Sequence, residues 1–379
     1  MPRSIFFLGA TGYIGSSVLS ALLKAVDQDT KITILARNPA VLSGFEAADA
    51  RITAVQGSLG DHSQLSALAS AHDVTINTAE ADDLGAVQAL LRGLKVRHET
   101  TGTRPIIIHT SGTGVLADNA KGAYAGTEIF TDAEADPTAN PPLKPISDLK
   151  PARIHRGVDL AVQAADTDGY AFSYIVIPAT IYGISQTVFA DKGLANAQSQ
   201  QVSYVTRIGI DRKVPAQFGE GKNLWPNVEI HDVAELYALV YRQATAPGPG
   251  DHGENGYFFG ETGEYSLLQA YEAIGAQLFA LGLVESPTPK PLSDDEIDKY
   301  IGGSQYPGSN SRARAVHSRR LGWKPAHTGN EPFLASIKED VNWTASHNRG
   351  RAPDGNFVFG PGPVRVEDGA EGGWELPGQ

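Results

Sequence analysis

The chain contains no cysteine among its 379 residues. This absence excludes disulfides, thiolate nucleophiles and cysteine-based zinc sites. The ten histidines form no HExxH motif and show no other ligand spacing, so we expect no metal centre. No apolar run is long enough to span a bilayer, and the first run stops after Leu8 at a glycine-rich turn, as a buried strand does and a signal peptide does not. We therefore expect a cytoplasmic protein with no membrane partner.

Basic residues are in the minority. The chain has 31 Lys and Arg against 43 Asp and Glu, which gives a formal net charge of −12. A nucleic-acid-binding protein would need a basic stripe to neutralise phosphates, so we expect no nucleic-acid partner and a solvated acidic surface. The length allows one large domain or two moderate ones.

Short apolar runs alternate with helix-compatible segments through the first half of the chain. Buried parallel strands are expected to read as such continuous runs. A helix predicted over Ala152–Ala165 precedes the last of them. The pattern predicts an α/β fold with a Rossmann-type, doubly wound parallel sheet. The predicted strands are Ile5–Leu8, Ile32–Ala36, Ile52–Gln56, Val74–Asn77, Ile106–His109 and Phe172–Pro178.

The second half predicts a smaller α/β cap domain at the carboxyl side of the sheet. Helical patterns at His231–Ala244, Ser266–Leu281 and Ser293–Tyr300 alternate with Gly/Pro-rich loops and one short strand, Tyr257–Gly260. The expected units are a dinucleotide-binding domain over 1–180 with 226–260 partly returning to it, a substrate or cap region over 181–345, and a Gly/Pro-rich extension over 346–379.

The composition of the extension is typical of a flexible tail. Its Phe357, Val358, Phe359 and Trp374 indicate instead that it could lie along the body of the protein or along a partner subunit.

The most specific motif is Gly9-Ala-Thr-Gly12-Tyr-Ile-Gly15, between an apolar strand and an apolar helix pattern. Gly9 permits the tight turn, Gly12 lets the backbone approach a pyrophosphate, and Gly15 allows close packing of helix on strand. The diphosphate would then bind the free N–H groups at the helix N-terminus. We assign Gly9, Thr11, Gly12, Tyr13, Ile14 and Gly15 to the cofactor.

The end of the second strand indicates which cofactor. A NAD site would place Asp or Glu there, whereas this chain has Arg37 followed by Asn38. A guanidinium can bind a 2′-phosphate, so the prediction is NADP(H). Asp61 could contact the adenine or could cap the following helix. Further predicted cofactor contacts are Thr78, Ala79, Ser111, His155 and Pro178.

These motifs together resemble the extended and atypical short-chain dehydrogenase/reductases, including epimerase-like and NmrA-like proteins of the type found in fungi. The resemblance runs from about Ser4 to Pro325 and rests on GATGYIG, ILARNP, IIIHTSGTGV, VIPATIYG, PNVEIHDVAELY and SRRLGWKP. It implies a Ser or Thr that polarises a carbonyl, a Tyr that transfers the proton, and a Lys that lowers the pKa of that Tyr and holds the ribose.

The chain departs from this family at the Tyr and Lys positions. Counting back from Asp159 places His155 at the Lys position and Pro151 at the Tyr position, while counting from Pro178 places Arg156 and Ala152 there. The Tyr is missing in either alignment. A proton donor need only lie within hydrogen-bond reach of the substrate, so another residue can take the role. The candidate catalytic residues are His155, Ser111, Thr113 and Tyr124.

The function expected from the sequence is an NADP(H)-dependent oxidoreductase that reduces a carbonyl, imine or activated alkene of a small organic substrate. One alternative is an enzyme that binds NADP(H) but performs a cyclisation or isomerisation. A second is an NmrA-like cofactor sensor. The resemblance also implies that a homodimer could form.

Overall fold

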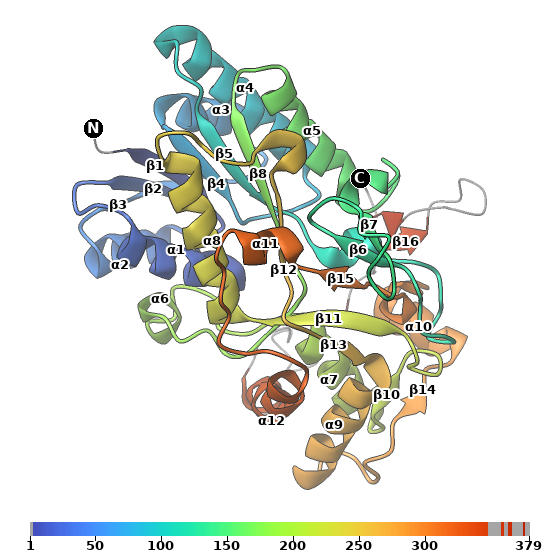
Figure 1. The fold of residues 1–379 in the computed structure, drawn as a ribbon. Helices are drawn as coiled ribbons and strands as arrows, with labels where there is room; N and C mark the ends of the chain where they lie inside the picture. Colours follow the sequence, from blue (N-terminus) through green and yellow to red (C-terminus); the bar gives the residue numbers. More distant parts are fainter. Residues whose placement is uncertain (1–2, 348–357, 360–362, 366–373, 376–379) are drawn as a thin grey trace.

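A seven-stranded sheet forms the centre of the computed structural model, which describes residues 3–347, 358–359, 363–365 and 374–375 (Figure 1). The strand order is β12-β8-β5-β4-β1-β2-β3, and all neighbours are parallel. The predicted α/β class and its doubly wound sheet are therefore confirmed. The strands are β1 (Ser4–Leu8), β2 (Lys31–Ala36), β3 (Ile52–Gln56), β4 (Val74–Asn77), β5 (Ile106–Thr110), β8 (Phe172–Pro178) and β12 (Tyr257–Gly260).

Helices cover both faces of this sheet. The chain runs outward from β1 to β3 and then returns to β4 on the other side, so right-handed crossovers place the connecting helices on opposite faces. One group contains α1 packed on α8, and the other contains α3 on α4 and α4 on α5. The helices are α1 (Tyr13–Ala25), α2 (Leu42–Ala48), α3 (His62–Ala71), α4 (Leu84–Thr101), α5 (Arg156–Thr167) and α8 (Ile230–Thr245).

Because both faces are covered, the central strands are buried along nearly their whole length. Every residue of β4 and β5 is buried, as are four of the five residues of β1. Burial on both faces explains why these strands read as continuous apolar runs.

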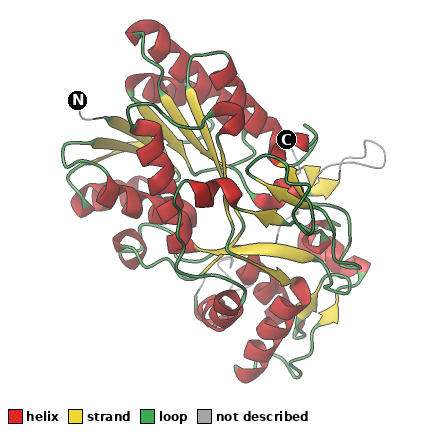
Figure 2. Cartoon of the chain, in the orientation of Figure 1, coloured by secondary structure: helices red, strands yellow, loops and turns green. Residues whose placement is uncertain are grey.

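A smaller α/β region lies at the carboxyl edge of the sheet, in the lower half of Figure 2. Its three-stranded sheet, β13-β11-β9, packs with the helices α7, α9 and α12. Ser266 and Ser293 cap α9 and α10 with capping boxes, which explains why both helices begin where the sequence predicted. The elements of this region are β9 (Thr180–Tyr182), α6 (Val188–Asp191), α7 (Gln201–Arg212), β10 (Ala216–Gln217), β11 (Leu224–Glu229), β13 (Gly263–Ser266), α9 (Leu267–Ala280), β14 (Lys290–Pro291), α10 (Asp294–Ile301) and α12 (Glu331–Ser346).

Several short strands and turns complete the fold. The strands β6, β7 and β15 form a small sheet of their own. The remaining short elements are β6 (Ile129–Thr131), β7 (Leu143–Pro145), β15 (Ala313–Arg314), α11 (Val316–Arg320), β16 (Val364–Arg365), β17 (Trp374–Glu375) and the 3₁₀ turns η1 (Pro39–Val41), η2 (Thr113–Leu116), η3 (Ile146–Asp148), η4 (Gly253–Asn255) and η5 (Tyr306–Gly308).

Two expectations from the sequence were wrong. The helix predicted from Ala152 begins at Arg156, because His155 has φ +66° and ψ −30° and ends the turn that precedes the helix. The second half also contains more than one strand. The six-residue strand β11 was missed because Pro226 and Asn227 within it are poor strand formers.

The described part of the C-terminal extension contacts the cap region. Phe359 packs edge-on against Tyr204 and Tyr300, with ring centroids 6.0 Å and 4.7 Å away. Val358 is 56% exposed, and Phe357 lies outside the described residues. A contact of this segment with the body of the protein is therefore observed at Phe359.

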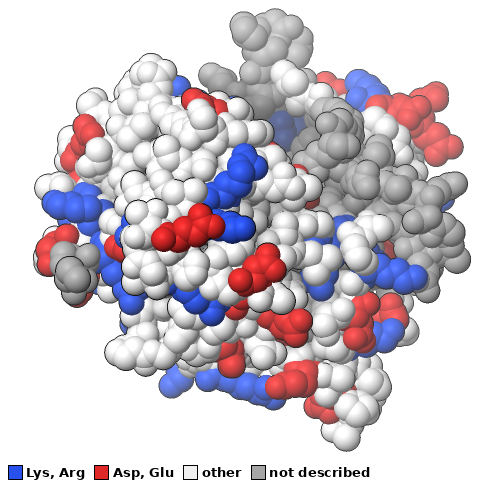
Figure 3. Space-filling model, turned by 90° about the horizontal axis from the view of Figure 1, so that it is seen from above, with Lys and Arg blue, Asp and Glu red and all other residues white. Residues whose placement is uncertain are grey.

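On the face seen in Figure 3, basic and acidic side chains are interspersed. Among the described residues, none of the helices combines the length and the hydrophobicity that crossing a bilayer requires.

Candidate functional site

The glycine-rich loop between β1 and α1 has no room for side chains. Gly9 has φ +90°, and a Cβ there would lie 2.6 Å from the carbonyl of Thr78. A Cβ on Gly15 would lie 2.0 Å from the carbonyl oxygen of Gly9. The tight turn and the close packing of helix on strand expected from the motif are both present in this geometry.

The N-terminus of α1 is open to a ligand. Gly12 is the N-cap and, having no side chain, offers no capping group, while the first turn carries no acidic residue. The first N–H groups of a helix have no partner within the helix, and the helix dipole favours an anion there. The hydroxyl of Tyr13 donates to the Gly183 carbonyl at 2.6 Å. A glycine-rich loop followed by helix N–H groups that have no partner within the helix fits a dinucleotide pyrophosphate.

Several other predicted cofactor residues form local contacts of this loop. Thr78 donates its hydroxyl to the carbonyl of Leu8 at 2.7 Å, which ties the end of β4 to the end of β1. The N–H of Ala79 donates to Asn77 at 3.2 Å. The carbonyl of Thr11 accepts from the N–H of Asn196 at 3.0 Å. Ile14 packs, partly buried, against the core, and Pro178 ends β8 at the same edge of the sheet.

The predicted adenosine contacts lie at the surface. Arg37 is exposed directly after β2, and no hydrogen bond or ion pair of its guanidinium occurs within the described part of the chain. Asn38 caps the turn η1 by accepting from the N–H of Ala40 at 3.0 Å. Asp61 is the N-cap of α3 and accepts from the N–H of Gln64 at 3.0 Å. The capping alternative for Asp61 is therefore the one observed.

His155 is fixed by Asp82, a residue that the sequence analysis missed. The main-chain N–H of His155 and its ring Nδ1 bind the same oxygen, Oδ1 of Asp82, at 2.9 Å and 2.8 Å. An ionised carboxylate can only accept a hydrogen bond, so Nδ1 carries a proton, and Nε2 takes no part in this contact. The three acids of "EADD" after β4 were the signal for this residue, because the carboxyl ends of parallel strands meet at one edge of a sheet.

The ring of His155 faces the loop after β5. A Cβ on Gly112 would lie 3.3 Å from its Nε2, and a Cβ on Gly114 would lie 3.1 Å from it. The imidazole is 15% exposed, so water or a ligand can reach it. A positive φ is costly for a residue other than glycine, and such strain clusters at functional sites.

Arg156, the other residue aligned with the family's Lys, lies in a different environment. Its guanidinium is buried and donates to the hydroxyl of Tyr257 at 2.9 Å. Of the two alignments, the one that uses His155 therefore places a side chain against the loop after β5.

Ser111 and Thr113 differ in what their hydroxyls do. The Ser111 hydroxyl donates to Asp159 Oδ2 at 3.0 Å, so its one proton is used inside the protein. Burial is the largest influence on Asp159 and raises its pKa to about 6, against the opposing effects of the charge of His155 and the Ser111 hydrogen bond. No hydrogen bond of the Thr113 hydroxyl is found within the described residues. Thr113 is thus the better placed of the two to bind a substrate oxygen.

A buried histidine lies beneath this site. The ring Nδ1 of His109, at the end of β5, accepts from the side-chain amide of Asn77 at 3.2 Å. Burial, together with the nearby charge of His155, lowers the pKa of His109 to about 4. His109 is therefore neutral near pH 7 and was not singled out from the sequence because it reads as part of the strand.

Tyr124 lies at the surface of the molecule. Its side chain is 53% exposed, and its main-chain carbonyl accepts from Asn310 at 3.2 Å. Tyr306, which the sequence analysis did not consider, approaches instead from η5. A Cβ on Gly114 would lie 2.2 Å from the Tyr306 hydroxyl oxygen. Within a Gly/Pro-rich loop this Tyr carried no sequence signal.

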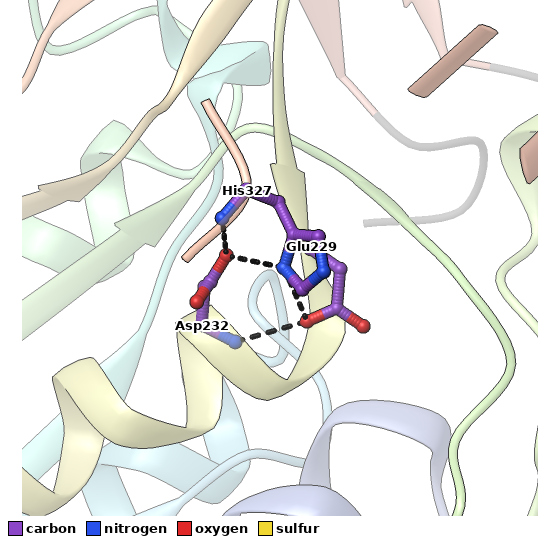
Figure 4. A group of neighbouring side chains, drawn as sticks. All are labelled: Glu229, Asp232 and His327. Carbon is purple, nitrogen blue, oxygen red and sulfur yellow. Dashed lines mark hydrogen bonds and ion pairs between the residues drawn. The ribbon is translucent and has the colours of Figure 1, made fainter. Parts of the chain in front are cut away.

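Figure 4 shows the trio of described residues whose atoms are spaced closely enough for a metal ion, Glu229, Asp232 and His327. Their carboxylates already accept N–H groups. Glu229 caps α8 by accepting from the N–H groups of His231 and Asp232, at 2.6 Å and 3.1 Å. Asp232 accepts from the N–H groups of Ala326 and His327 at 2.8 Å and 2.9 Å. The trio joins α8 to the loop before α12. The absence of a metal centre, which we expected from the sequence, stays a prediction.

The comparisons with known proteins place a cofactor domain at the N-terminal half. Residues 9–129 match a family model described as NAD(P)H-binding. An oxidase of an Acremonium species, ucsJ, is 28% identical over 346 residues, which cover 86% of this chain and 93% of that protein. The uncharacterised protein C2A9.02 of Schizosaccharomyces pombe is 26% identical over 342 residues, which cover 88% of this chain and 98% of the relative.

Solved structures with a similar fold include nucleotide-sugar enzymes. DesIV, a dTDP-glucose 4,6-dehydratase of Streptomyces venezuelae with NAD bound, superposes with a TM-score of 0.61 at 17% identity, over 92% of this chain and 99% of that one. The UDP-glucuronic acid 4-epimerase of Bacillus cereus, also with NAD, superposes with a TM-score of 0.58 at 15% identity, over 90% and 99%. The resemblance found in the sequence is thus confirmed for the NAD(P)-binding domain and for the epimerase/dehydratase fold.

Proposed function

From a chain that carries an NAD(P)-binding domain in an epimerase/dehydratase-type fold, we propose an NADP(H)-dependent oxidoreductase that reduces a carbonyl, imine or activated alkene of a small organic molecule. The single observation that carries the proposal is His155, fixed by Asp82 and facing the Gly112–Gly114 backbone at the carboxyl edge of the sheet. Ligands of doubly wound folds bind at this edge.

The chemistry of the bound cofactor is hydride transfer to a substrate carbon. The protein must then bind the substrate oxygen or nitrogen and deliver one proton to it. The hydroxyl of Thr113 can donate a hydrogen bond to that atom. Protonated His155 can deliver the proton from Nε2, while the Asp82 carboxylate stabilises the imidazolium through Nδ1. Solvent then reprotonates the ring, which is 15% exposed.

The preference for NADP(H) is supported by Arg37. Its exposed guanidinium follows β2, where the ribose of a bound dinucleotide would lie, and the next residue is Asn38 and not an acid. A guanidinium can bind a 2′-phosphate with two parallel hydrogen bonds, whereas a carboxylate would repel it.

The first experiment is a titration of the purified protein with NADPH and with NADH, followed by energy transfer from tryptophan to nicotinamide. We expect saturable binding with NADPH preferred. NADPH oxidation is then followed at 340 nm with a panel of aromatic and aliphatic aldehydes, ketones and imines.

The two measurements separate the competing functions. Binding together with substrate-dependent oxidation supports the oxidoreductase. Binding with no oxidation of NADPH by any substrate of the panel contradicts it and favours a non-redox enzyme or a sensor. Failure of both nucleotides to bind contradicts all three functions.

A further inference from the structure

The cap region contains a cavity of about 250 Å³ between α7, β11, α9 and α12. Its wall is formed mainly by apolar side chains, both aromatic and aliphatic. Those that carry the argument are Phe218, Trp225, Tyr265, Tyr271, Tyr306 and Phe333. Among the described lining residues there is no Lys, Arg, His, Asp or Glu, and Gln200 and Gln201 contribute the amide groups.

The polar groups of two of these rings are already used inside the protein. The indole N–H of Trp225 donates to the carbonyl of Ser309 at 2.6 Å, and the hydroxyl of Tyr265 donates to Thr180 at 3.0 Å. A nucleoside diphosphate needs cations or several free donors for its phosphates. The cavity offers no cation and presents ring faces, so it suits an apolar ligand better than a nucleotide sugar.

The volume limits the size of that ligand. A dry apolar cavity of about 150 Å³ is sufficient for benzene. A cavity of about 250 Å³ therefore holds a ring system of roughly the size of two fused rings.

One side of the cavity reaches the loop after β5, which carries Gly112 and Gly114. Tyr306 lines the cavity with its ring, which packs edge-on against Trp225 at a centroid distance of 5.7 Å. Its hydroxyl oxygen and His155 Nε2 both approach Gly114, at 2.2 Å and 3.1 Å from the position that a Cβ would take there. The wall of the cavity thus ends at the group proposed to deliver the proton.

We infer that this cavity binds a small apolar substrate built on one or two fused rings, and that the Tyr306 hydroxyl hydrogen-bonds to the polar group of that substrate. The inference rests on the proposed function, because it assigns the substrate class to the same site. It differs from the substrates of the structural neighbours, which are nucleotide sugars by name. Tyr306 thereby brings a phenol to the site from η5, whereas the missing family Tyr would have come from the turn before α5, at Pro151 or Ala152.

The test measures binding to the full-length protein by calorimetry with three probes, 2-naphthol, 2-methylnaphthalene and UDP-glucose. The cavity is filled by Ala270→Leu, since Ala270 on α9 is 4% exposed and lines the wall. Ala276→Leu is the matched control, because Ala276 is an exposed residue of the same helix. We expect both naphthalenes to bind, UDP-glucose not to bind, and Ala270→Leu but not Ala276→Leu to weaken the naphthalenes at least tenfold.

Tyr306→Phe tests the hydrogen bond without filling the cavity and covers the case in which Ala270→Leu does not fold. Loss of one hydrogen bond should weaken 2-naphthol by roughly three- to tenfold and leave 2-methylnaphthalene unchanged. Equal effects on both probes would overturn the role of Tyr306. Stronger binding of UDP-glucose than of 2-naphthol, or unchanged binding to a folded Ala270→Leu variant, would overturn the substrate class.

NADPH titration of the same samples keeps the two proposals apart. Binding of the naphthalenes requires no cofactor. A protein that binds NADPH but no naphthalene contradicts only the substrate class. A protein that binds naphthalenes but neither nucleotide contradicts the proposed function.

Discussion

The main-chain N–H and the ring Nδ1 of His155 both bind one oxygen of Asp82, at 2.9 Å and 2.8 Å. The pair couples the loop after β4 to the turn before α5. It also holds His155 in a left-handed backbone conformation, with φ +66°, that this residue would otherwise avoid. One carboxylate thus sets the backbone, the tautomer and the direction of the imidazole.

Asp82→Asn should reduce turnover while leaving the affinity for NADPH within about twofold. An amide cannot stabilise an imidazolium as a carboxylate does, so proton delivery by His155 weakens. Loss of a general acid costs a factor of roughly 10² to 10⁴. The measurement is kcat at a fixed pH together with the Kd of NADPH, and we expect kcat to fall while the Kd stays within that twofold range.

The neighbouring residue provides the control. Asp83 is the N-cap of α4 and accepts from the N–H of Ala86 at 2.8 Å. Asn caps a helix about as well as Asp does, so Asp83→Asn should leave turnover and stability nearly unchanged. Equal losses of turnover in the two variants would argue against a specific role of Asp82.

Gly15→Ala should destabilise the glycine-rich loop and weaken NADPH binding. The new Cβ would lie 2.0 Å from the carbonyl oxygen of Gly9, so the loop or the helix must move. We expect a fall in affinity of at least tenfold and a lower Tm. Gly157→Ala is the comparison, because Gly157 also lies in the first turn of a helix and a Cβ there meets nothing within 4 Å. That variant should be neutral or slightly stabilising. Normal NADPH affinity in Gly15→Ala would show that the cofactor does not use this loop.

Arg37→Ala should weaken NADPH and leave NADH nearly unaffected. A guanidinium that binds the 2′-phosphate makes charge-assisted hydrogen bonds, whose loss corresponds to roughly a 10- to 100-fold change in Kd. Lys31→Ala removes an exposed cation at the other end of the same strand and should change neither Kd. If Arg37→Ala weakens both nucleotides equally, Arg37 does not distinguish them and the preference for NADP(H) fails.

Apolar periodicity was sufficient to predict the sheet. β1, β4 and β5 are buried on both faces, so their sequences carry the signal without help from distant residues. β11 was missed because its pairing with β9 and β13 stabilises a segment, LWPNVE, whose own preference is for a turn. Prediction from local propensity fails where pairing with distant strands determines the structure.

The candidate site shows the same difference between features encoded locally and features that depend on residues distant in the sequence. The Gly9–Gly15 loop is contiguous, so its role could be predicted from spacing alone. Asp82 lies 73 residues before His155 and Tyr306 lies 151 residues after it, so both are close to His155 only in space. The sequence marks Asp82 only as one of three acids after β4, and it gives no signal for Tyr306. The start of α5 was also misplaced, because it depends on the hydrogen bonds from His155 to Asp82 and not on the helix propensity of residues 152–155.

The Asp159 carboxyl makes stability depend on pH in an unusual direction. Burial is the main cause that raises its pKa, from an unfolded value near 3.8 to about 6 in the folded protein. Between these two values the folded state binds more protons than the unfolded state. This group therefore contributes stability that is fully present below about pH 4, falls as the pH rises to about 6, and stays lost above that.

Asp159→Asn removes this titration. An Asn side chain can still accept the Ser111 hydroxyl at the same place, so the fold is preserved. The stability of the variant relative to the unmodified protein should therefore rise between pH 4 and pH 7, by an amount on the order of 1–3 kcal/mol. Urea unfolding at pH 4.5, 6 and 7.5 measures the difference.

Asp61→Asn serves as a control of opposite sign. The N–H of Gln64, followed by the hydroxyl of Ser63, lowers the pKa of Asp61, so the ionised carboxylate stabilises the folded state above about pH 4. The stability of Asp61→Asn relative to the unmodified protein should therefore fall as the pH rises, whereas the relative stability of Asp159→Asn should rise. A relative stability of Asp159→Asn that does not change with pH would mean that Asp159 is ionised in the folded protein over the whole range. In that case the pair formed by Ser111 and Asp159 would be an anionic group beneath the loop after β5.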